Sequence, residues 1–268
     1  MQQFLNRFLR TESGRTRAIL DIGAGLLQLT GAERGEQCVA EFRDKNYSTV
    51  LLGRFNPLIF SPEWLRDNKV IGPEEAQNAL EDGGIEIMAP NVVSMKIGSM
   101  KLLVEDKRFM LLVGDEPLIR AKDFPASCFS LLRHTPVSAV GLNYNVSLIG
   151  DEEDKWNRFG DILAPKDHWG SFMTSDSGER MGGLRSITLD RQKTNTDGLS
   201  YRRLILEIPE SSKERLAILK INNHFDLSKD GVLSDGDAAL EIINNHWDEM
   251  MERSNELAQQ VKDLADNA

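Results

Sequence analysis

Residues 18–25 hold the pattern in this chain that most suggests cofactor chemistry. The sequence Ala-Ile-Leu-Asp-Ile-Gly-Ala-Gly ends an apolar stretch with Asp21 and then places Gly23 and Gly25 close behind it. Glycines in such a turn let the backbone approach a bound nucleotide, because they carry no side chain that would collide with it. Glu41 follows 20 residues after Asp21, near the spacing at which an acidic side chain binds a ribose. These residues are therefore candidates for binding a nucleoside cofactor.

This stretch resembles the first motif of the class I S-adenosylmethionine-dependent methyltransferases, in which a strand ending in Asp precedes a Gly-x-Gly loop. The resemblance implies S-adenosylmethionine as the cofactor, and residues 56–60, Asn-Pro-Leu-Ile-Phe, loosely resemble the Asn-Pro-Pro-aromatic motif of the amino-methylating members. The chain departs from the family after Gly25, because the stretch before Cys38 leaves little room for the crossover helix that a parallel sheet requires. A glycine-rich turn between antiparallel strands explains the same residues, so methyl transfer is an alternative function.

A second candidate is a calcium site at residues 226–237. Oxygen-bearing side chains stand at positions 1, 3, 5, 9 and 12 of an EF-hand-like loop, with glycine at position 6. Calcium prefers several hard oxygen ligands, and the glycine permits the sharp turn. Position 12 carries Asp instead of the longer bidentate Glu, so the segment equally suits a turn in which Ser234 or Asp235 caps the following helix. The candidate ligands are Asp226, Ser228, Asp230, Ser234 and Asp237.

A short sequence recurs within the last fifty residues. Ile-Asn-Asn-His-Phe-Asp at residues 221–226 returns as Ile-Asn-Asn-His-Trp-Asp at residues 243–248. His224 and His246, with a neighbouring Asp, are residue types that hold a transition metal. A histidine on a helix more often packs against neighbours or faces solvent. Metal binding at residues 224–248 is therefore the second alternative function.

The most regular pattern lies in the last helix. Apolar residues recur at alternating spacings of three and four, and Ser254 interrupts the series once: Leu240, Ile243, Trp247, Met250, Ser254, Leu257, Val261 and Leu264. Such a stripe is typical of helices that pair with another helix. We expect the helix to cover its own sheet through Met251 and to contact a second copy or a partner protein beyond it. The predicted interface residues are Met250, Leu257, Val261 and Leu264.

Hydrophobic periodicity and turn residues predict the remaining elements. Helices are expected to begin at Ser61 and at Pro73, where a cap residue or a proline opens an apolar pattern, and to span residues 118–133, 154–163 and about 235–266. Four strands in quick succession between residues 85 and 113 indicate an antiparallel meander. The expected strands are 18–20, 39–42, 49–52, 85–88, 92–97, 101–105, 108–113, 137–148, 183–189, 201–208 and 215–222, with 169–174 as a further one.

The two halves of the chain share one order of elements: an early strand, one or two helices, a run of strands and a long helix. This order predicts an α+β fold in which antiparallel sheets each cradle helices, arranged as a tandem pseudo-repeat that ends in a long C-terminal helix. The expected units are residues 1–136 and residues 137–268. A single continuous sheet built from both halves is equally compatible with the pattern.

Composition narrows the class of protein. The chain has 268 residues, a formal net charge of −10 and a pI near 5.0, so a nucleic-acid partner is not expected. No apolar run approaches the roughly 20 residues that span a bilayer, so no membrane partner is expected either. Cys38 and Cys128 form no disulfide framework, which favours the cytoplasm, and small buried hydrophobic positions are the expected role of both thiols. No convergent set of catalytic groups is evident, and no cofactor is expected for the leading interpretation.

Two further segments carry a resemblance. Residues 132–144, Leu-Arg-His-Thr-Pro-Val-Ser-Ala-Val-Gly-Leu-Asn-Tyr, and residues 53–65, Gly-Arg-Phe-Asn-Pro-Leu-Ile-Phe-Ser-Pro-Glu-Trp-Leu, are similar to an uncharacterised, sporadically distributed bacterial protein family. The resemblance implies no known activity or catalytic residues, and a patchy distribution suggests mobile-element or phage-defence systems. The leading hypothesis is a non-enzymatic accessory subunit or homodimer that acts by protein–protein contact.

Overall fold

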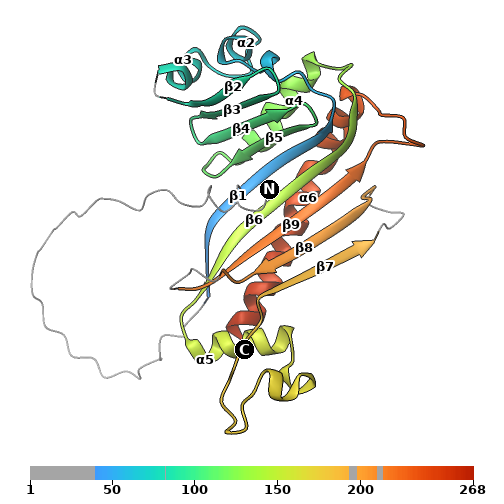
Figure 1. Cartoon of the computed structure of the whole chain (residues 1–268). Coiled ribbons are helices and arrows are strands. Elements are labelled where there is room, and N and C mark those ends of the chain that lie inside the picture. The colour runs from blue at the N-terminus through green and yellow to red at the C-terminus, as the bar shows by residue number, and fades with distance from the viewer. Residues whose placement is uncertain (1–39, 82, 193–197, 210–213) are drawn as a thin grey trace, which may run out of the picture. The chain divides into compact units, whose positions relative to one another are not determined.

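One antiparallel sheet of nine strands runs through the part of the chain that the computed structural model describes, which comprises residues 40–81, 83–192, 198–209 and 214–268 (Figure 1). The strand order is β2-β3-β4-β5-β1-β6-β9-β8-β7. Because helices alternate with antiparallel strands and a long helix closes the chain, the expected α+β class is confirmed. The strands are β1 (Glu41–Gly53), β2 (Ile85–Ala89), β3 (Val92–Ile97), β4 (Met100–Glu105), β5 (Arg108–Val113), β6 (Val137–Gly150), β7 (Ser186–Gln192), β8 (Tyr201–Glu207) and β9 (Arg215–Asp226).

The meander expected between residues 85 and 113 is confirmed, with strand ends that differ from the expected ones by at most one residue. Its two inner strands, β4 and β5, alternate between buried and more exposed side chains, which is the period of two that a sheet with one covered face requires. The turns between β3, β4 and β5 are short, so neighbouring strands in the sequence are also neighbours in the sheet.

The centre of the sheet is formed by its two longest strands, β1 and β6, which pair with each other. Two separate strands at residues 39–42 and 49–52 are expected from the sequence, but the structure has the single strand β1, whose register shifts between Arg43 and Asn46. Asp44 has a positive φ of 49° at this irregularity. The polar residues that suggest a break are therefore accommodated as a bulge within one strand.

The same order of elements occurs twice around this centre. A long strand (β1 or β6) is followed by helical segments, a meander (β2–β5 or β7–β9) and a helix (α4 or α6). Because β1 and β6 lie side by side, the two meanders extend from them in opposite directions. Strands from both sides of the expected boundary at residues 136 and 137 thus belong to one sheet. The strand expected at residues 18–20 lies outside the described residues, as does Val39.

Five α-helices and three 3₁₀ turns complete the described part of the chain. Ser61 caps the first helix as expected, because its hydroxyl accepts a hydrogen bond from the Trp64 N–H at 3.2 Å. The strand expected at residues 169–174 is wrong: local bonds such as Met173 N–H to the Gly170 carbonyl form a 3₁₀ turn instead. The helical elements are η1 (Pro57–Ile59), α2 (Pro62–Asp67), α3 (Pro73–Glu81), α4 (Arg120–Leu131), α5 (Glu153–Leu163), η2 (Lys166–His168), η3 (Gly170–Phe172) and α6 (Gly236–Asp266).

The core lies between the sheet and the pair of helices α4 and α6, which contact each other behind the strands (Figure 1). Trp247 of α6 is 2% exposed, and its ring lies 6.0 Å from that of Tyr47 on β1, edge to face. The Thr49 hydroxyl donates a hydrogen bond to the Ala121 carbonyl of α4 at 2.5 Å. Burial raises the pKa of Tyr144 to about 12, so its hydroxyl stays protonated and donates to Asn255 Oδ1 at 3.3 Å.

The opposite face of the central strands carries small and neutral polar side chains. Asn145 Nδ2 donates to Asn46 Oδ1 at 2.9 Å, and Asn143 Nδ2 donates to Ser48 Oγ at 3.2 Å. These pairs join β1 to β6 across the sheet, because directly opposite residues of antiparallel strands point to the same face. The sheet therefore separates an apolar layer under the helices from a mixed, more polar face.

Candidate interaction surface

The predicted interface residues of α6 lie on or beside the helix face that packs against the chain's own sheet. Met250 is 0% exposed, and its sulfur lies 3.3 Å from Nη2 of Arg202 on β8. Leu257, Val261 and Leu264 are half-buried and pack against the edge of the core. Only these later positions keep surface that a partner can reach, so Met250 contributes to the interior and not to an accessible stripe.

Ser254, the polar member of the apolar stripe, belongs to a buried polar cluster. Its hydroxyl donates to the Met250 carbonyl at 2.6 Å and accepts a hydrogen bond from Asn223 Nδ2 at 3.0 Å. Asn223 Oδ1 also accepts a hydrogen bond from Arg202 Nε at 2.6 Å. Arg202 is only 8% exposed, so this bond gives its buried guanidinium a partner under the helix. Buried polar groups require such partners, because each unmet hydrogen bond is costly away from water. This cluster fixes β8, β9 and α6 in one arrangement.

An open groove of about 510 Å³ runs between the outer strands β7 and β8 and the later half of α6. Leu189 of β7 and Leu257 of α6 give it apolar walls, and Arg191 of β7 faces the same side of the sheet as Leu189. The full lining is Leu189, Asp190, Arg191, Arg202, Leu204, Arg253, Glu256, Leu257 and Gln260. The groove thus lies between Leu257, a half-buried residue of the predicted helix interface, and the edge strand β7.

The edge strand β7 is open to solvent along almost its whole length. Every residue from Ser186 to Gln192 is exposed except Ile187, which is half-buried, and Leu189 is 54% exposed. In Figure 1 it is the outermost strand, with none of the described elements beyond it. Such an edge presents unpaired backbone donors and acceptors, which are a template for adding another strand.

A second exposed apolar group lies in the segment that leads into β7. Trp169, Phe172 and Met181 are 61%, 78% and 64% exposed. Next to this segment, Trp156, Arg180 and Leu184 line another open groove, of about 400 Å³. Arg180 pairs with Asp161 of α5 at 3.2 Å, so the segment is tied to that helix. Large exposed apolar side chains in one segment are typical of contact surfaces.

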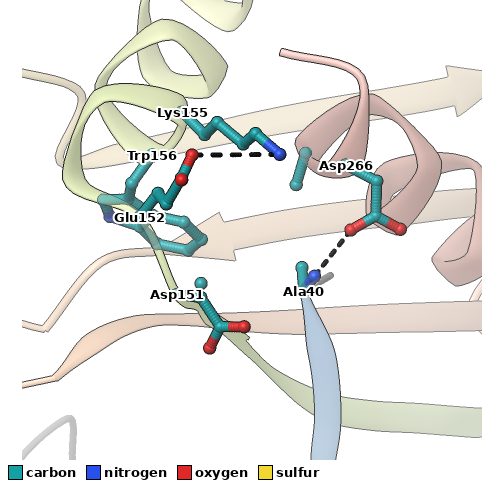
Figure 2. A pocket seen from close by; sticks show the side chains of 8 residues that line it. Ala40, Asp151, Glu152, Lys155, Trp156 and Asp266 are labelled. Carbon is teal, nitrogen blue, oxygen red and sulfur yellow. Dashed lines mark hydrogen bonds and ion pairs between the residues drawn. The ribbon is translucent and has the colours of Figure 1, made fainter. Parts of the chain in front are cut away.

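A small cavity marks the point where β1 begins and where β6 and α6 end (Figure 2). Its volume is about 10 Å³, which is room for roughly one water molecule and excludes an organic ligand. The Ala40 N–H donates to the Asp266 carboxylate at 2.6 Å, and Lys155 lies 3.9 Å from Glu152; both contacts are drawn in Figure 2. The bond from Ala40 to Asp266 fastens the start of β1 to the end of the last helix, which is a structural role.

The residues of the predicted calcium loop form a turn between β9 and α6. Asp230 and Gly231 have positive φ values of 52° and 78°, and Ser234 pairs with Val137 through backbone hydrogen bonds. Asp235 caps α6, because its Oδ1 accepts from the Ala238 N–H at 3.0 Å. Asp226 ends β9, and its Oδ1 lies 3.0 Å from His224 Nε2, whereas Asp237 lies 3.5 Å from Arg133. The turn at residues 226–237 therefore has the helix-capping geometry, and Ser228 lies within it.

The two histidines of the repeated sequence do not meet. His224 stacks on Tyr201 with ring centroids 4.5 Å apart, on the polar face of the sheet. His246 lies on α6, 5.1 Å from the ring of Phe225, whose side chain points to the core face. Neighbouring strand residues point to opposite faces, so the sheet separates the two imidazoles. Within the described residues, no three His, Cys, Asp or Glu side chains gather where a metal ion could bind.

The residues of the predicted cofactor motif are placed only in part. Asp21, Gly23 and Gly25 lie outside the described residues, so nothing about their arrangement is tested. Glu41 is exposed at the start of β1, opposite Ile149 of β6, and its carboxylate lies 4.0 Å from Arg43. Both strands that pair with β1 are antiparallel to it. Cys38 also lies outside, whereas Cys128 is fully buried, and burial raises the pKa of its thiol.

Comparison with known protein families, with curated proteins and with solved structures finds no match to this chain. Among the described helices, none combines the length and the apolar character needed to cross a membrane. The candidate surface therefore has to be interpreted from its own geometry. That geometry consists of an edge strand with no described strand on its outer side, a groove beside it and the exposed flank of the last helix.

Proposed function

We propose that this protein acts by binding another protein, without catalysis, through the surface formed by β7, the adjoining groove and the later turns of α6. The observation that carries the proposal is the outer edge of β7, which pairs with no other described strand and lies next to a groove with apolar walls. An edge strand offers main-chain hydrogen bonds, and a groove beside it accepts side chains of the added segment. Leu189 and Leu257 provide the apolar contact, and Arg191 and Arg253 of the lining provide polar contact.

The chemistry of this surface suits recognition. Protein interfaces combine an apolar centre with a polar rim, and arginine is enriched in them. Arg253 lies at the groove and pairs with Glu249 at 2.6 Å, which holds its guanidinium at the mouth. Asp190 accepts two hydrogen bonds from Arg203, at 2.7 and 2.8 Å, on the other face of the sheet. Compared with the helix interface expected from sequence, the proposed surface omits the buried Met250, keeps the later turns of α6 and adds the edge strand β7.

A photo-crosslinking experiment tests this function. A benzophenone amino acid replaces Gln260, an exposed residue at the groove, and in a second variant replaces Gln77, an exposed residue of α3. We expect illumination of cells that produce the chain to give a covalent protein adduct from position 260 and none from position 77. No adduct at position 260, or equal adducts at both positions, would contradict the proposal.

Two alternative functions stay predictions. Calorimetry with S-adenosylmethionine, repeated on Asp21→Ala, tests the methyltransferase alternative, for which micromolar binding lost in the variant is the supporting result. A melting-temperature shift between calcium and chelator tests the ion-binding alternative. Neither outcome depends on the β7 surface, so both experiments are independent of the crosslinking result.

A further inference from the structure

The hydrogen-bond pattern of β7 determines which of its backbone groups face outward. The Ile208 N–H donates to the Arg185 carbonyl at 2.9 Å, in the same register that pairs β7 with β8. In an antiparallel ladder, hydrogen-bonded pairs alternate with non-bonded pairs. The residues whose backbone groups point to β8 are therefore Ile187, Leu189 and Arg191. The N–H and C=O groups that point away from the sheet belong to Ser186, Thr188, Asp190 and Gln192.

These outward groups are arranged symmetrically about Leu189. When a second β7 approaches antiparallel with residue 189 opposite residue 189, Thr188 of one copy faces Asp190 of the other. In the same register, Ser186 faces Gln192. All four outward-facing residues of each strand then belong to hydrogen-bonded pairs. This register satisfies every backbone group that β7 leaves unpaired toward solvent.

The side chains agree with this register. On the helix side, Leu189 meets Leu189 of the second copy, and Ile187 meets Arg191. On the other side, Thr188 meets Asp190, so no two like charges stand opposite each other. Moving the register by two residues in one direction places Asp190 opposite Asp190, which is destabilising for directly opposed strand residues. Moving it in the other direction leaves Gln192 without a partner in the strand.

The strand carries the charged residues Asp190 and Arg191, but within the described residues it lacks four other features that protect edges from pairing. Natural edge strands carry Pro, Lys, a bulge or a covering element, because an open edge invites association. The sequence Ser-Ile-Thr-Leu-Asp-Arg-Gln contains neither Pro nor Lys, and its pairing with β8 has no register shift. Leu189, at the centre, is a large apolar side chain that is 54% exposed.

From these observations we propose that two copies of this chain associate through β7, with Leu189 on the two-fold axis. The two nine-stranded sheets then form one continuous antiparallel sheet. Leu189 of the second copy is placed at the mouth of the groove, near Leu257. This inference rests on the proposed function and names its partner as a second copy of the chain.

Disulfide trapping tests the register. Residues 189 of the two copies form a non-bonded pair with Cα atoms about 4.5 Å apart, within the roughly 4.4–6.8 Å that a disulfide spans. Thr188 and its counterpart stand two residues out of register, about 8 Å apart, which is too far for a disulfide. Both cysteine variants also carry Cys38→Ser, and Cys128 is fully buried. Mild oxidation is expected to give a dimer of twice 30.1 kDa from Leu189→Cys and none from Thr188→Cys.

Five other outcomes would overturn this inference. Equal crosslinking of both variants indicates random collision, and no crosslinking of either variant, with their melting temperatures unchanged, excludes the β7 pairing. If light scattering finds the wild-type chain dimeric while Leu189→Cys stays uncrosslinked, the copies associate elsewhere. An adduct of another mass from position 260, with no trapped dimer, contradicts self-association but leaves the proposed function standing. Loss of both the adduct and the trapped dimer contradicts both.

Discussion

β2 and β7 close the two ends of the same sheet, but β2 has five residues and a register shift between Ile85 and Ile87, whereas β7 has seven residues and none. Glu86, at the irregularity of β2, accepts hydrogen bonds from Ser94 and Lys101, each within 2.9 Å. The 3₁₀ turn η1 also contacts β2 and β3. At β7, by comparison, none of the described elements pairs with the outer backbone edge.

This difference supports the proposal that the C-terminal half, and not the N-terminal half, pairs with another chain. A short, bulged edge with a charged side chain resists the addition of another strand. The N-terminal meander therefore ends in a protected edge, and the C-terminal meander ends in one suited to pairing. We therefore expect substitutions at the centre of the sheet to destabilise both halves, whereas substitutions at β7 should change association and substitutions at β2 should not.

The largest loss of stability is expected at the centre that both edges share. Trp247→Ala removes a fully packed ring that contacts β1, so we expect the free energy of unfolding to fall by about 3–5 kcal/mol. Urea denaturation monitored by circular dichroism measures this change. A loss below about 1 kcal/mol would show that the centre does not hold the two halves together.

The next largest loss of stability is expected in the buried polar cluster of Arg202, Asn223 and Ser254. Asn223→Ala removes a side chain that bonds Arg202, Ser254 and the Leu142 carbonyl, all under the helix. We expect a loss of about 2 kcal/mol, because buried polar groups lose partners. Asn143→Ala, a polar position of similar type on the half-exposed face, is the matched control and should lose less than about 1 kcal/mol. Equal losses from the two variants would contradict the assigned role of the cluster.

One lysine introduced on each edge strand tests the difference between β7 and β2 directly. Leu189→Lys should shift the mass found by light scattering toward that of the monomer, and its free energy of unfolding should change by only about 0.5 kcal/mol. Ile87→Lys, at an edge residue that is 43% exposed, should leave the mass unchanged. A loss of association in Ile87→Lys, or none in Leu189→Lys, would reverse the roles of the two edges.

The smallest expected effect is the pH-dependent stabilisation that Glu86 gives to the β2 edge. Burial alone raises the pKa of Glu86, but hydrogen bonds from Lys101 and Ser94 outweigh it and hold the pKa below its ordinary 4.5. A carboxyl whose pKa is lowered by folding stabilises the fold above its unfolded pKa and loses that contribution as pH falls through the folded value. The pair is partly exposed, so Glu86→Gln should cost about 0.5 kcal/mol at pH 7 and less near pH 3. A cost that grows in acid would contradict the assignment.

Local patterns in the sequence predicted most of the elements but not their long-range placement. The meander strands and the last helix are evident because alternation and helical spacing act over a few residues. The pairing of β1 with β6 is not evident, since it joins residues about a hundred positions apart. The 3₁₀ turn at Gly170–Phe172 was mistaken for a strand because aromatic residues suit strands as well.

The candidate surface was foreseen only on its helix side. Leu257 lines the groove as a residue of the predicted stripe, but the same stripe placed Met250 at an interface although it lies in the core. Heptad spacing alone does not distinguish a helix that packs on a second copy from one that packs on its own sheet. The sequence does not identify Leu189 as an interface residue, because a strand becomes an edge strand only through its place in the sheet. The absence of Pro and Lys in residues 186–192 is the one local feature that favours pairing there.

Hydrogen exchange of two backbone amides in the wild-type chain tests the central claim most directly. The amides of Thr188 and Asp190 point away from β8, so in a single copy they face solvent and exchange quickly. If two copies pair through β7, both amides are protected at high protein concentration, dilution removes this protection, and the amide of Leu189 stays protected throughout. Rapid exchange at Thr188 and Asp190 at every concentration would contradict the pairing of two copies through β7.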